Sequence, residues 1–394
     1  MIRGFPTGPF ALAAAITACV GATVGAERSA LPLAADFGGA VAWGGAAFVA
    51  AFGISKAVAN LIAGPSVVRL GRRRTLLFGW LIAVPVPFAL AFSSQSWPIV
   101  AANVFLGLSQ GLCWTTALVM QVELAGPRRR GLAAGVNEFA GYAAVGGAAY
   151  AAAVAAGLLD ARRGPALVAA CAIALGILLS LLARETAQAG TPATRAPWPA
   201  WSAGDAVIYQ AGFMNNANDA LAWAFVPVLL VARGADLAQV GVVAGVYPAA
   251  WAVTQLAAGP LSDRVGRRPL VVGGMLLQAG AIAGLAAGGN AVLLALAWGL
   301  GTGMVYPTLV AAAADAAGGA DPARAIAVYR FWRDAGVAGG ALGSVIVAGL
   351  AGLPATLLVV AGLTAASGLL AIRLPVRPEH PAAPAPVAPS AARP

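Results

Sequence analysis

The sequence predicts an all-α membrane protein with twelve transmembrane helices in two pseudo-symmetric bundles of six helices. Three observations favour this fold class. The 394-residue chain is 60% hydrophobic and only 10% charged, whereas soluble proteins average about 25% charged residues. Apolar stretches of about 20 residues, enough to cross a bilayer core of about 30 Å, recur along the chain. A similar arginine-rich segment follows the second and the eighth of these stretches, which indicates two related halves.

The apolar stretches define the expected spans in chain order. They cover residues 8–30, 41–63, 74–94, 97–121, 131–157 and 165–183 in the first half, and residues 205–231, 238–260, 269–288, 291–313, 325–350 and 354–373 in the second. The first stretch is too long for the apolar region of a signal peptide, so it is interpreted as a spanning helix. An even number of spans places both termini on one side of the membrane.

The domain boundaries follow from breaks in this pattern. Residues 1–183 and 205–373 are the expected N-terminal and C-terminal six-helix bundles. Residues 184–204 begin with the polar stretch RETAQAGTPATRAPWPAW, which predicts a cytoplasmic linker. Residues 374–394 are rich in Pro and Ala and predict a disordered cytoplasmic tail.

Arginines are distributed unequally among the segments between the spans. If the N-terminus is cytoplasmic, the outer loops hold Arg162, Arg163 and Arg233, and the inner segments hold most of the other arginines. Short cytoplasmic loops of membrane proteins carry an excess of Lys and Arg. We therefore expect an integral multi-pass plasma membrane protein of the bacterial inner-membrane type, with both termini in the cytoplasm.

Several function classes are disfavoured by the residue content. The net charge of +10 does not indicate nucleic-acid binding, because apolar runs separate the basic residues. The three cysteines lack CxxC or Cys/His spacing, so neither a metal site nor a cofactor is predicted. No HExxH motif and no histidine within a span is present, so we expect no enzyme and assign no catalytic residue.

The arginine-rich segments carry a recognisable pattern. They read GPSVVRLGRRR from Gly64 and GPLSDRVGRRP from Gly259. The second copy fits G-x-x-x-D-R-x-G-R-R in full and resembles the inner-loop motif of the major facilitator superfamily. The resemblance covers the chain except its tail. It implies a secondary transporter that moves a small solute by alternating access between the two bundles.

The residue types in this motif suit a contact between helices. Gly259 allows close helix approach, Gly266 allows a tight turn, and Asp263 can cap a neighbouring helix and pair with a loop arginine. The resemblance implies that such contacts latch one conformation, and a basic loop that only sets the topology is the alternative. In the first copy Val68 replaces the acidic residue, so a weaker latch is expected there. The expected latch residues are Gly64, Arg69, Gly71, Arg72, Arg73, Gly259, Asp263, Arg264, Gly266, Arg267 and Arg268.

Other signals of the superfamily are incomplete. In the fourth span, NVFLGLSQGLCW has Gly107 where proton-coupled members often carry Arg. In the fifth span, GYAAVGG lacks the Gly-Pro that is typical of antiporters. The resemblance therefore leaves the direction of transport and the coupling ion open.

The stretch VYRFWRDAG places Arg330, Arg333 and Asp334 inside an expected span, where a charged group costs about 2.5–3.5 kcal/mol. Arg330 and Asp334 share a helix face and can pair. In the superfamily fold this span lies near Lys56, so a Lys56–Asp334 pair between the halves is expected, with Arg333 left for an anionic group. These residues are the expected inner gate, and a static ion cluster is the alternative. Glu138, at similar depth, is the expected coupling-proton site or else part of a permanent salt bridge.

The seventh span contains the polar stretch NNANDALAW. This density of polar residues predicts a water-filled cavity or a substrate-facing turn, with interhelical hydrogen bonding as the alternative. The expected cavity residues are Gln110, Trp114, Asn137, Asn215, Asn216, Asn218, Asp219, Tyr247, Trp251, Gln255 and Tyr306. Glu27 and Arg28, at the outer end of the first span, are interpreted as surface charges.

The sequence thus favours a secondary active transporter that exports a small solute with proton coupling. Uptake of an anionic metabolite, motivated by Arg330 and Arg333, and a non-transporting membrane sensor of the same fold are the alternatives. The expected partners are a small-molecule substrate, protons and the lipid bilayer, without nucleic acid. A monomer is expected.

Overall fold

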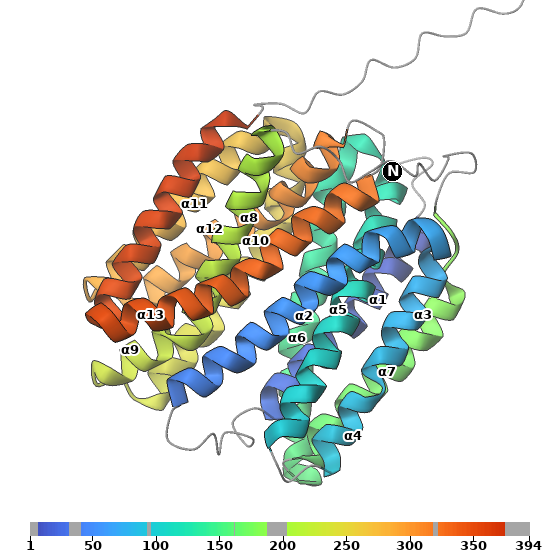
Figure 1. The fold of residues 1–394 in the computed structure, drawn as a ribbon, viewed down its shortest axis with the longest axis horizontal. Helices are drawn as coiled ribbons and strands as arrows, with labels where there is room; N and C mark the ends of the chain where they lie inside the picture. Colours follow the sequence, from blue (N-terminus) through green and yellow to red (C-terminus); the bar gives the residue numbers. More distant parts are fainter. Residues whose placement is uncertain are drawn as a thin grey trace, which may run out of the picture.

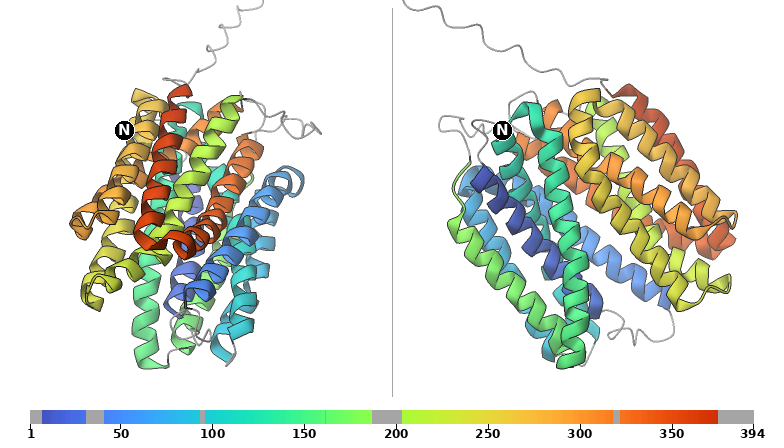
Figure 2. Two further views of the ribbon diagram at one scale, coloured as in Figure 1. Left: turned by 60° about the vertical axis from the view of Figure 1, so that its left-hand side comes forward. Right: turned by 180° about the vertical axis from the view of Figure 1, so that it is seen from behind.

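The computed structural model describes residues 7–30, 41–92, 96–160, 162–186, 203–317 and 322–374. Over these described residues the chain is helical and contains no strand. Helices α1 to α7 form one bundle and helices α8 to α13 form a second bundle beside it (Figure 1). Figure 2 shows the same division from two further directions. The predicted all-α fold with two helix bundles is confirmed.

The N-terminal bundle accounts for the first six expected spans. It contains α1 (Thr7–Ala30), α2 (Val41–Leu70), α3 (Arg72–Ala83), α4 (Pro85–Phe92), α5 (Ser96–Ala125), the short 3-10 helix η2 (Pro127–Arg129), α6 (Arg130–Leu158) and α7 (Arg163–Leu182). α3 and α4 together occupy the third span. The break falls at Val84, directly before Pro85, because proline has no N–H and its ring crowds the preceding turn.

The C-terminal bundle accounts for the last six expected spans. It contains α8 (Ala203–Ala224), α9 (Val226–Ala232), α10 (Leu237–Val265), α11 (Arg267–Ala286), α12 (Ala291–Ala316), α13 (Pro322–Leu370) and the 3-10 helix η3 (Ala371–Arg373). α8 and α9 share the seventh span. α13 covers the last two spans, with a kink at Gly352, whose φ of 81° lies in a region that favours glycine.

Ten helical segments of the described residues are long and apolar enough to cross a membrane. One of them, Pro322–Arg373, is 52 residues long and contains two of the expected spans. α8 is not among the ten, since the polar residues of NNAND lower its hydropathy. The arrangement is consistent with the twelve spans that the sequence predicts. Most of the predicted linker and tail lies outside the described residues.

Large apolar side chains cover the outer faces of the bundles. Leu81 is 64% exposed, Phe88 61% and Leu350 84%. Exposed apolar side chains in such number suit contact with lipid chains. The chain is therefore an integral multi-pass membrane protein.

The two bundles meet along two main helix pairs. α2 packs against α13, and α6 packs against α10. Figure 1 shows α2 and α13 crossing the molecule side by side between the bundles. Three of these four helices, α2, α6 and α13, carry the buried ionisable residues Lys56, Glu138, Arg330, Arg333 and Asp334, so the functional site is sought there.

Candidate functional site

Ionisable side chains from three helices meet between the bundles. This charge cluster consists of Lys56 on α2, Glu138 on α6, and Arg330, Arg333 and Asp334 on α13. Lys56 is 7% exposed and the other four side chains are fully buried. Because buried charges are costly unless they are paired, the partners of each group decide what the cluster can do.

Three of the four ion pairs of the cluster join the two bundles, and the fourth lies within α13. Arg330 Nη1 lies 3.1 Å from Glu138 Oε1, and Arg333 Nη1 lies 3.8 Å from Glu138 Oε2. Lys56 Nζ lies 3.8 Å from Asp334 Oδ1, and Arg333 Nη2 lies 2.8 Å from the same oxygen. Each carboxylate therefore faces two cations, and Arg333 contacts both carboxylates.

Two expectations from the sequence are wrong here. Arg330 pairs with Glu138 on the other bundle rather than with Asp334 on its own helix, and Arg333 is held by both carboxylates rather than left for an anionic group. The physical reason is that α6 brings Glu138 against α13, whereas an Arg-before-Asp pair is the poorer orientation within a helix. The expected Lys56–Asp334 pair lies at 3.8 Å.

Amide side chains complete the environment of Asp334. Asn60 Nδ2 donates to Asp334 Oδ2 at 2.7 Å and to the backbone oxygen of Arg330 at 3.2 Å. Asn216 Nδ2 donates to Asp334 Oδ1 at 3.2 Å. Thr115 donates to Asn60 Oδ1 at 2.6 Å and so fixes the orientation of that amide. Asp334 thus receives hydrogen bonds from both bundles.

The N-terminal bundle holds Glu138 in a similar way. Trp114 Nε1 and Asn137 Nδ2 each donate to Glu138 Oε1 at 3.1 Å. Thr17 on α1 donates to Asn137 Oδ1 at 2.8 Å. Trp114 and Asn137, which the sequence predicted for the cavity, therefore serve the charge cluster instead.

Aromatic rings contact the cations of the cluster. The guanidinium of Arg333 lies 4.4 Å from the centre of the Tyr306 ring, and that of Arg330 lies 5.7 Å from the Trp114 ring. Lys56 Nζ lies 5.4 Å from the same indole. Such cation–π contacts are stronger when they are desolvated, as they are here.

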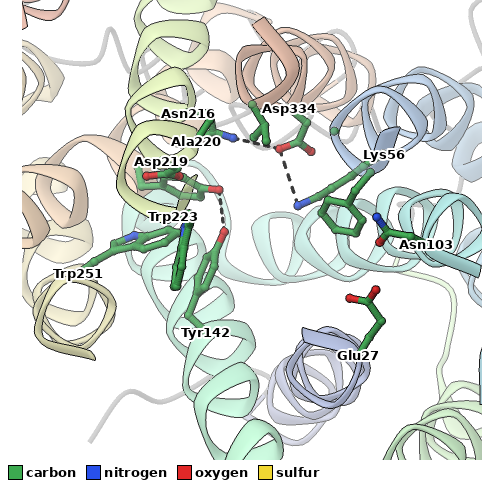
Figure 3. A pocket seen from close by; sticks show the side chains of 14 residues that line it. Glu27, Lys56, Asn103, Tyr142, Asn216, Asp219, Ala220, Trp223, Trp251 and Asp334 are labelled. Carbon is green, nitrogen blue, oxygen red and sulfur yellow. Dashed lines mark hydrogen bonds and ion pairs between the residues drawn. The ribbon is translucent and has the colours of Figure 1, made fainter. Parts of the chain in front are cut away.

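A cavity of about 340 Å³ lies beside the charge cluster, and both bundles line it (Figure 3). Its lining residues are Glu27, Phe52, Gly53, Lys56, Asn103 and Tyr142 from the N-terminal bundle, and Asn216, Asp219, Ala220, Trp223, Trp251, Tyr306, Asp334 and Val337 from the C-terminal bundle. Lys56 and Asp334 belong to both the cluster and the lining. A volume of this size suits a small organic ligand.

The cavity lies on the side of the charge cluster that is away from the arginine-rich segments. On α2, Lys56 lines the cavity, whereas Asn60, one turn nearer the arginine-rich end, is not among the described lining residues. On α13, which starts near that end, Asp334 and Val337 line the cavity and Arg330 is outside the described lining. The charge cluster thus separates the cavity from the arginine-rich end.

The cavity residues that the sequence predicted are divided by the structure. Asn216, Asp219, Trp251 and Tyr306 line the cavity. In the part of the chain that the structure describes, the lining does not include Gln110, Trp114, Asn137, Asn215, Asn218, Tyr247 or Gln255.

The polar stretch of α8 shows why the division arises. Gln278 Nε2 donates to Asn215 Oδ1 at 2.9 Å, and Asn218 Nδ2 donates to Gln278 Oε1 at 3.0 Å. These two asparagines join α8 to α11, as the alternative of interhelical hydrogen bonding expects. Asn216 and Asp219, which are three residues apart on α8, line the cavity instead.

Tyr247 supports the lining from behind. Its hydroxyl donates a short hydrogen bond to Asp219 Oδ1 and lies 3.4 Å from Thr302 Oγ1. The Tyr142 and Tyr306 hydroxyls, from opposite bundles, lie 2.9 Å apart at the cavity wall.

Sequence reasoning missed Glu27, Asn103, Tyr142 and Trp223. The interpretation of Glu27 as a surface charge is wrong, since its side chain is only 2% exposed and lines the cavity. The helical period could have revealed it, because residues three, four and seven positions earlier on α1 are buried as well. The side chain of Arg28 lies outside the described residues.

The second latch motif also joins the bundles. The carboxylate of Asp263, near the end of α10, accepts the backbone N–H groups of Gly131 and Leu132 at 3.0 Å each. These groups belong to the first turn of α6, whose N–H groups have no partner within the helix and where the helix dipole favours a negative charge. Arg267 Nη1 lies 2.7 Å from Asp263 Oδ1.

Asp315, at the end of α12, extends this contact. Arg267 Nε lies 3.0 Å from Asp315 Oδ2, and Arg130 Nη1 lies 2.9 Å from Asp315 Oδ1. Arg130 also donates to the backbone oxygen of Ala314 at 2.6 Å. Arg130 lies on α6 and Asp315 on α12, so this ion pair also crosses between the bundles.

Two glycines allow the close approach of α6 and α10. A Cβ atom added to Gly131 would collide with the backbone oxygen of Gly259, and a Cβ atom on Gly259 would collide with that of Gly131. Gly266 follows with a φ of 92°, which suits a glycine turn. This geometry fits the close helix approach and the tight turn that the sequence predicted.

The first copy of the motif makes different contacts. Arg72 Nη2 lies 2.5 Å from Glu123 Oε1 within the N-terminal bundle. Glu185 Oε2 accepts the backbone N–H of Arg72 at 2.8 Å and Glu185 Oε1 that of Arg73 at 3.2 Å, at the start of α3. Of the other motif residues, Arg69, Arg73 and Arg264 have exposed side chains, and Arg268 is half-buried. Gly64 packs against Ala327, and Gly71 has a φ of 86°.

Comparisons with known proteins identify the fold. A sequence model of the Major Facilitator Superfamily matches residues 10–206 and 208–394. The human organic anion transporter MFSD10 (TETRAN) matches with a TM-score of 0.75 and 18% identity, covering 93% of this chain and 99% of that chain. The E. coli fucose:proton symporter FucP matches with a TM-score of 0.73 and 14% identity, covering 94% of this chain and 98% of that chain. The proton:xylose symporter XylE, bound to 6-bromo-6-deoxy-D-glucose, matches with a TM-score of 0.73 and 13% identity, covering 94% of this chain and 95% of that chain. No curated protein matches the sequence.

Proposed function

The chain belongs to the major facilitator superfamily, and on this premise we propose that it is a secondary active transporter that exports a small solute in exchange for protons. The observation that carries the proposal is the cavity between the bundles. Both bundles line it, and two of its lining residues, Lys56 and Asp334, belong to the ion pairs that join the bundles. A solute that enters this cavity therefore contacts groups whose pairing has to change when the bundles move.

Alternating access requires that the closed side can open. The closed side is the arginine-rich end, where Asp263 holds the start of α6 and Arg130 holds Asp315. This end is expected to be cytoplasmic. We infer that the structure represents an outward-facing state, and that the inward-facing state forms when these contacts and the Arg330–Glu138 pair break.

Carboxylates supply the means of proton coupling. Glu138 holds Arg330 and Arg333 while the bundles are closed at this end, and protonation of Glu138 would remove its ion pairs with both, leaving Arg333 paired with Asp334 alone. In the cavity, Glu27, Asp219 and Asp334 provide further carboxylates. A solute that binds the ionised form of one of these carboxylates competes with a proton for it, and such competition favours exchange of solute for protons over their co-transport.

The alternative of anionic-metabolite uptake loses its main support. Arg330 and Arg333 motivated it, yet both are held by Glu138 and Asp334, and neither is among the described residues that line the cavity. The organic anion transporter among the structural matches shares the fold at 18% identity, which does not carry its substrate over to this chain.

Transport in proteoliposomes tests the proposal. A solute identified by thermal-shift screening should accumulate against its gradient when a pH gradient is imposed, and should stop doing so when the pH gradient is dissipated. Glu138→Gln should abolish this accumulation and retain solute exchange. Glu123→Gln is the matched control, because Glu123 pairs with Arg72 within one bundle, outside the charge cluster.

Each alternative gives a different result. Accumulation by Glu138→Gln that equals wild type would make Glu138 structural and would move the proton site to Asp219. A solute flux that does not depend on the pH gradient would refute proton coupling. Solute binding without any flux would favour the non-transporting sensor.

A further inference from the structure

The charged groups that line the cavity all have partners within the protein. Lys56 and Asp334 form an ion pair at 3.8 Å. Asp219 accepts a hydrogen bond from Tyr247, and Glu27 has an interaction partner as well. An ionic solute would have to compete with these partners, and burial of a charge costs far more than burial of an uncharged polar group. The lining therefore favours an uncharged solute.

Two tyrosine hydroxyls from opposite bundles can bind such a solute. The hydroxyl oxygens of Tyr142 on α6 and Tyr306 on α12 lie 2.9 Å apart, and neither has another hydrogen-bond partner among the described residues. Each hydroxyl carries one hydrogen, and only one of the two can lie between the oxygens. The pair therefore keeps one hydrogen to donate. Tyr142 is half-buried, and Figure 3 shows its side chain pointing from α6 towards the C-terminal bundle.

Resting on the proposed function, we propose that the transported solute is an uncharged aromatic molecule with a polar group that both accepts and donates hydrogen bonds, such as a phenolic hydroxyl. The oxygen of this group accepts the remaining hydrogen of the tyrosine pair. Its own hydrogen is donated to a carboxylate of the lining. A carboxylate that already has a partner can take this further bond, because its two oxygens offer about four lone-pair sites.

Aromatic side chains from both bundles form much of the remaining lining. They are Phe52 and Tyr142 in the N-terminal bundle, and Trp223, Trp251 and Tyr306 in the C-terminal bundle. The centroid of the Trp251 ring lies 3.9 Å from that of Tyr142 and 5.0 Å from that of Tyr306, so this ring packs beside the tyrosine pair. Aromatic rings attract one another beyond the apolar area that they bury. An aromatic body therefore suits these walls.

The tyrosine pair also lies next to the charge cluster. Tyr142 follows Glu138 by four residues, so both share a face of α6. The Tyr306 ring lies 4.4 Å from the guanidinium of Arg333. A solute that bonds to the pair therefore contacts residues that adjoin the ion pairs between the bundles, where its binding can affect their opening.

Other uncharged solutes fit this lining less well. A sugar carries hydroxyls around its whole surface, whereas much of this lining is aromatic or aliphatic. A hydrocarbon would leave the remaining hydrogen of the tyrosine pair without an acceptor, and a buried donor without an acceptor is costly.

Equilibrium dialysis of the purified protein in detergent, corrected with a detergent blank, tests the solute class without any ion gradient. The probes are 2-naphthol, 2-methylnaphthalene, 2-naphthylmethylamine and 2-naphthoate at neutral pH, which share one aromatic body. Naphthol should bind at least about threefold more tightly than methylnaphthalene, since a hydrogen bond contributes about 0.5–1.5 kcal/mol net. The cationic amine and the anionic carboxylate should both bind more weakly than naphthol.

Tyrosine-to-phenylalanine variants locate the site. Tyr142→Phe and Tyr306→Phe each keep one hydroxyl hydrogen and should keep most of the naphthol affinity. The double variant Tyr142→Phe/Tyr306→Phe keeps none and should bind naphthol at least about threefold more weakly, with methylnaphthalene binding unchanged. Tyr150→Phe is the matched control, because Tyr150 also lies on α6 and is 74% exposed, outside the described lining. If the double variant does not fold, the comparison of probes on the wild-type protein still decides.

The results separate this inference from the proposed function. Equal or tighter binding of any of the other three probes, full naphthol affinity in the double variant, or no naphthol binding at millimolar concentration overturns the assignment. Selective naphthol binding without pH-driven flux in proteoliposomes supports the assignment and refutes proton-coupled export. pH-driven transport of an ionic solute supports export and refutes the assignment.

Discussion

Lys56 and Asp334 form one ion pair, yet their removal should have unequal consequences. Asp334 accepts contacts from Lys56 at 3.8 Å, Arg333 at 2.8 Å and Asn60 at 2.7 Å. Lys56 has Asp334 as its ion-pair partner within the described residues. We predict that Asp334→Asn destabilises the protein far more than Lys56→Met.

The magnitude follows from the charge cluster. It holds three cations and two carboxylates, so Lys56→Met brings its formal charge from +1 to zero and Asp334→Asn raises it to +2. With an effective dielectric constant of about 20, Coulomb's law gives a gross attraction of about 4 kcal/mol for the 3.8 Å pair and about 6 kcal/mol for the 2.8 Å pair. After desolvation, loss of Asp334 should cost about 3–5 kcal/mol, and an apolar replacement of Lys56 below about 1 kcal/mol.

Unfolding of the purified variants in detergent, followed by tryptophan fluorescence, measures these losses. If Lys56 and Asp334 formed an isolated pair, as the sequence leads one to expect, the double variant would keep more stability than either single one, because no charge would be left unpaired. The structure changes that expectation: Arg333 still loses Asp334, so Lys56→Met/Asp334→Asn should lie between the two single variants. Equal losses in both single variants, with full recovery in the double variant, would refute the role assigned to Arg333.

The remaining predictions concern the arginine-rich end. Asp263→Asn weakens the hydrogen bonds from the start of α6 and should raise the labelling of cysteines placed at this end. Val68→Asp should lower this labelling. Unchanged labelling in both variants would contradict the latch. Gly259→Val forces α6 and α10 apart and should raise the same labelling, while Gly362→Val, at an open surface, is the control. Glu185→Gln weakens the acceptor at the start of α3 and should cost about 1 kcal/mol in unfolding, and an unchanged stability would show that the cap is not needed.

The helices could be predicted from the sequence because each one reflects a local property, a run of apolar residues as long as a bilayer is thick. The Gly259 contact was predictable for a similar reason, since its motif is contiguous in the chain. α8 is the instructive case. Its asparagines signalled a polar interior, but only the packing of α11 shows that Asn215 and Asn218 bond within one bundle and Asn216 faces the cavity.

The partners within the charge cluster could not be predicted, since they depend on how helices cross. From the sequence alone, one can predict only that Arg330 and Asp334, four residues apart, share a helix face. The choice of Glu138 as the partner of Arg330 depends on the placement of α6, a helix nearly 200 positions away in the chain. Asp315 and Glu27 were missed for a related reason, because a single acidic residue near a helix end resembles an ordinary surface charge.

Arg333 is bonded to Asp334, which lines the cavity, and to Glu138, which does not line it in the described part of the chain. One guanidinium thus forms an energetic link between the two carboxylates. Any solute that competes for Asp334 strengthens the hold of Arg333 on Glu138 and so disfavours a proton there. By thermodynamic reciprocity, a proton on Glu138 must then weaken solute binding by the same factor. In the proposed exchange mechanism, the two contacts of Arg333 would therefore make the cooperativity between solute and proton negative.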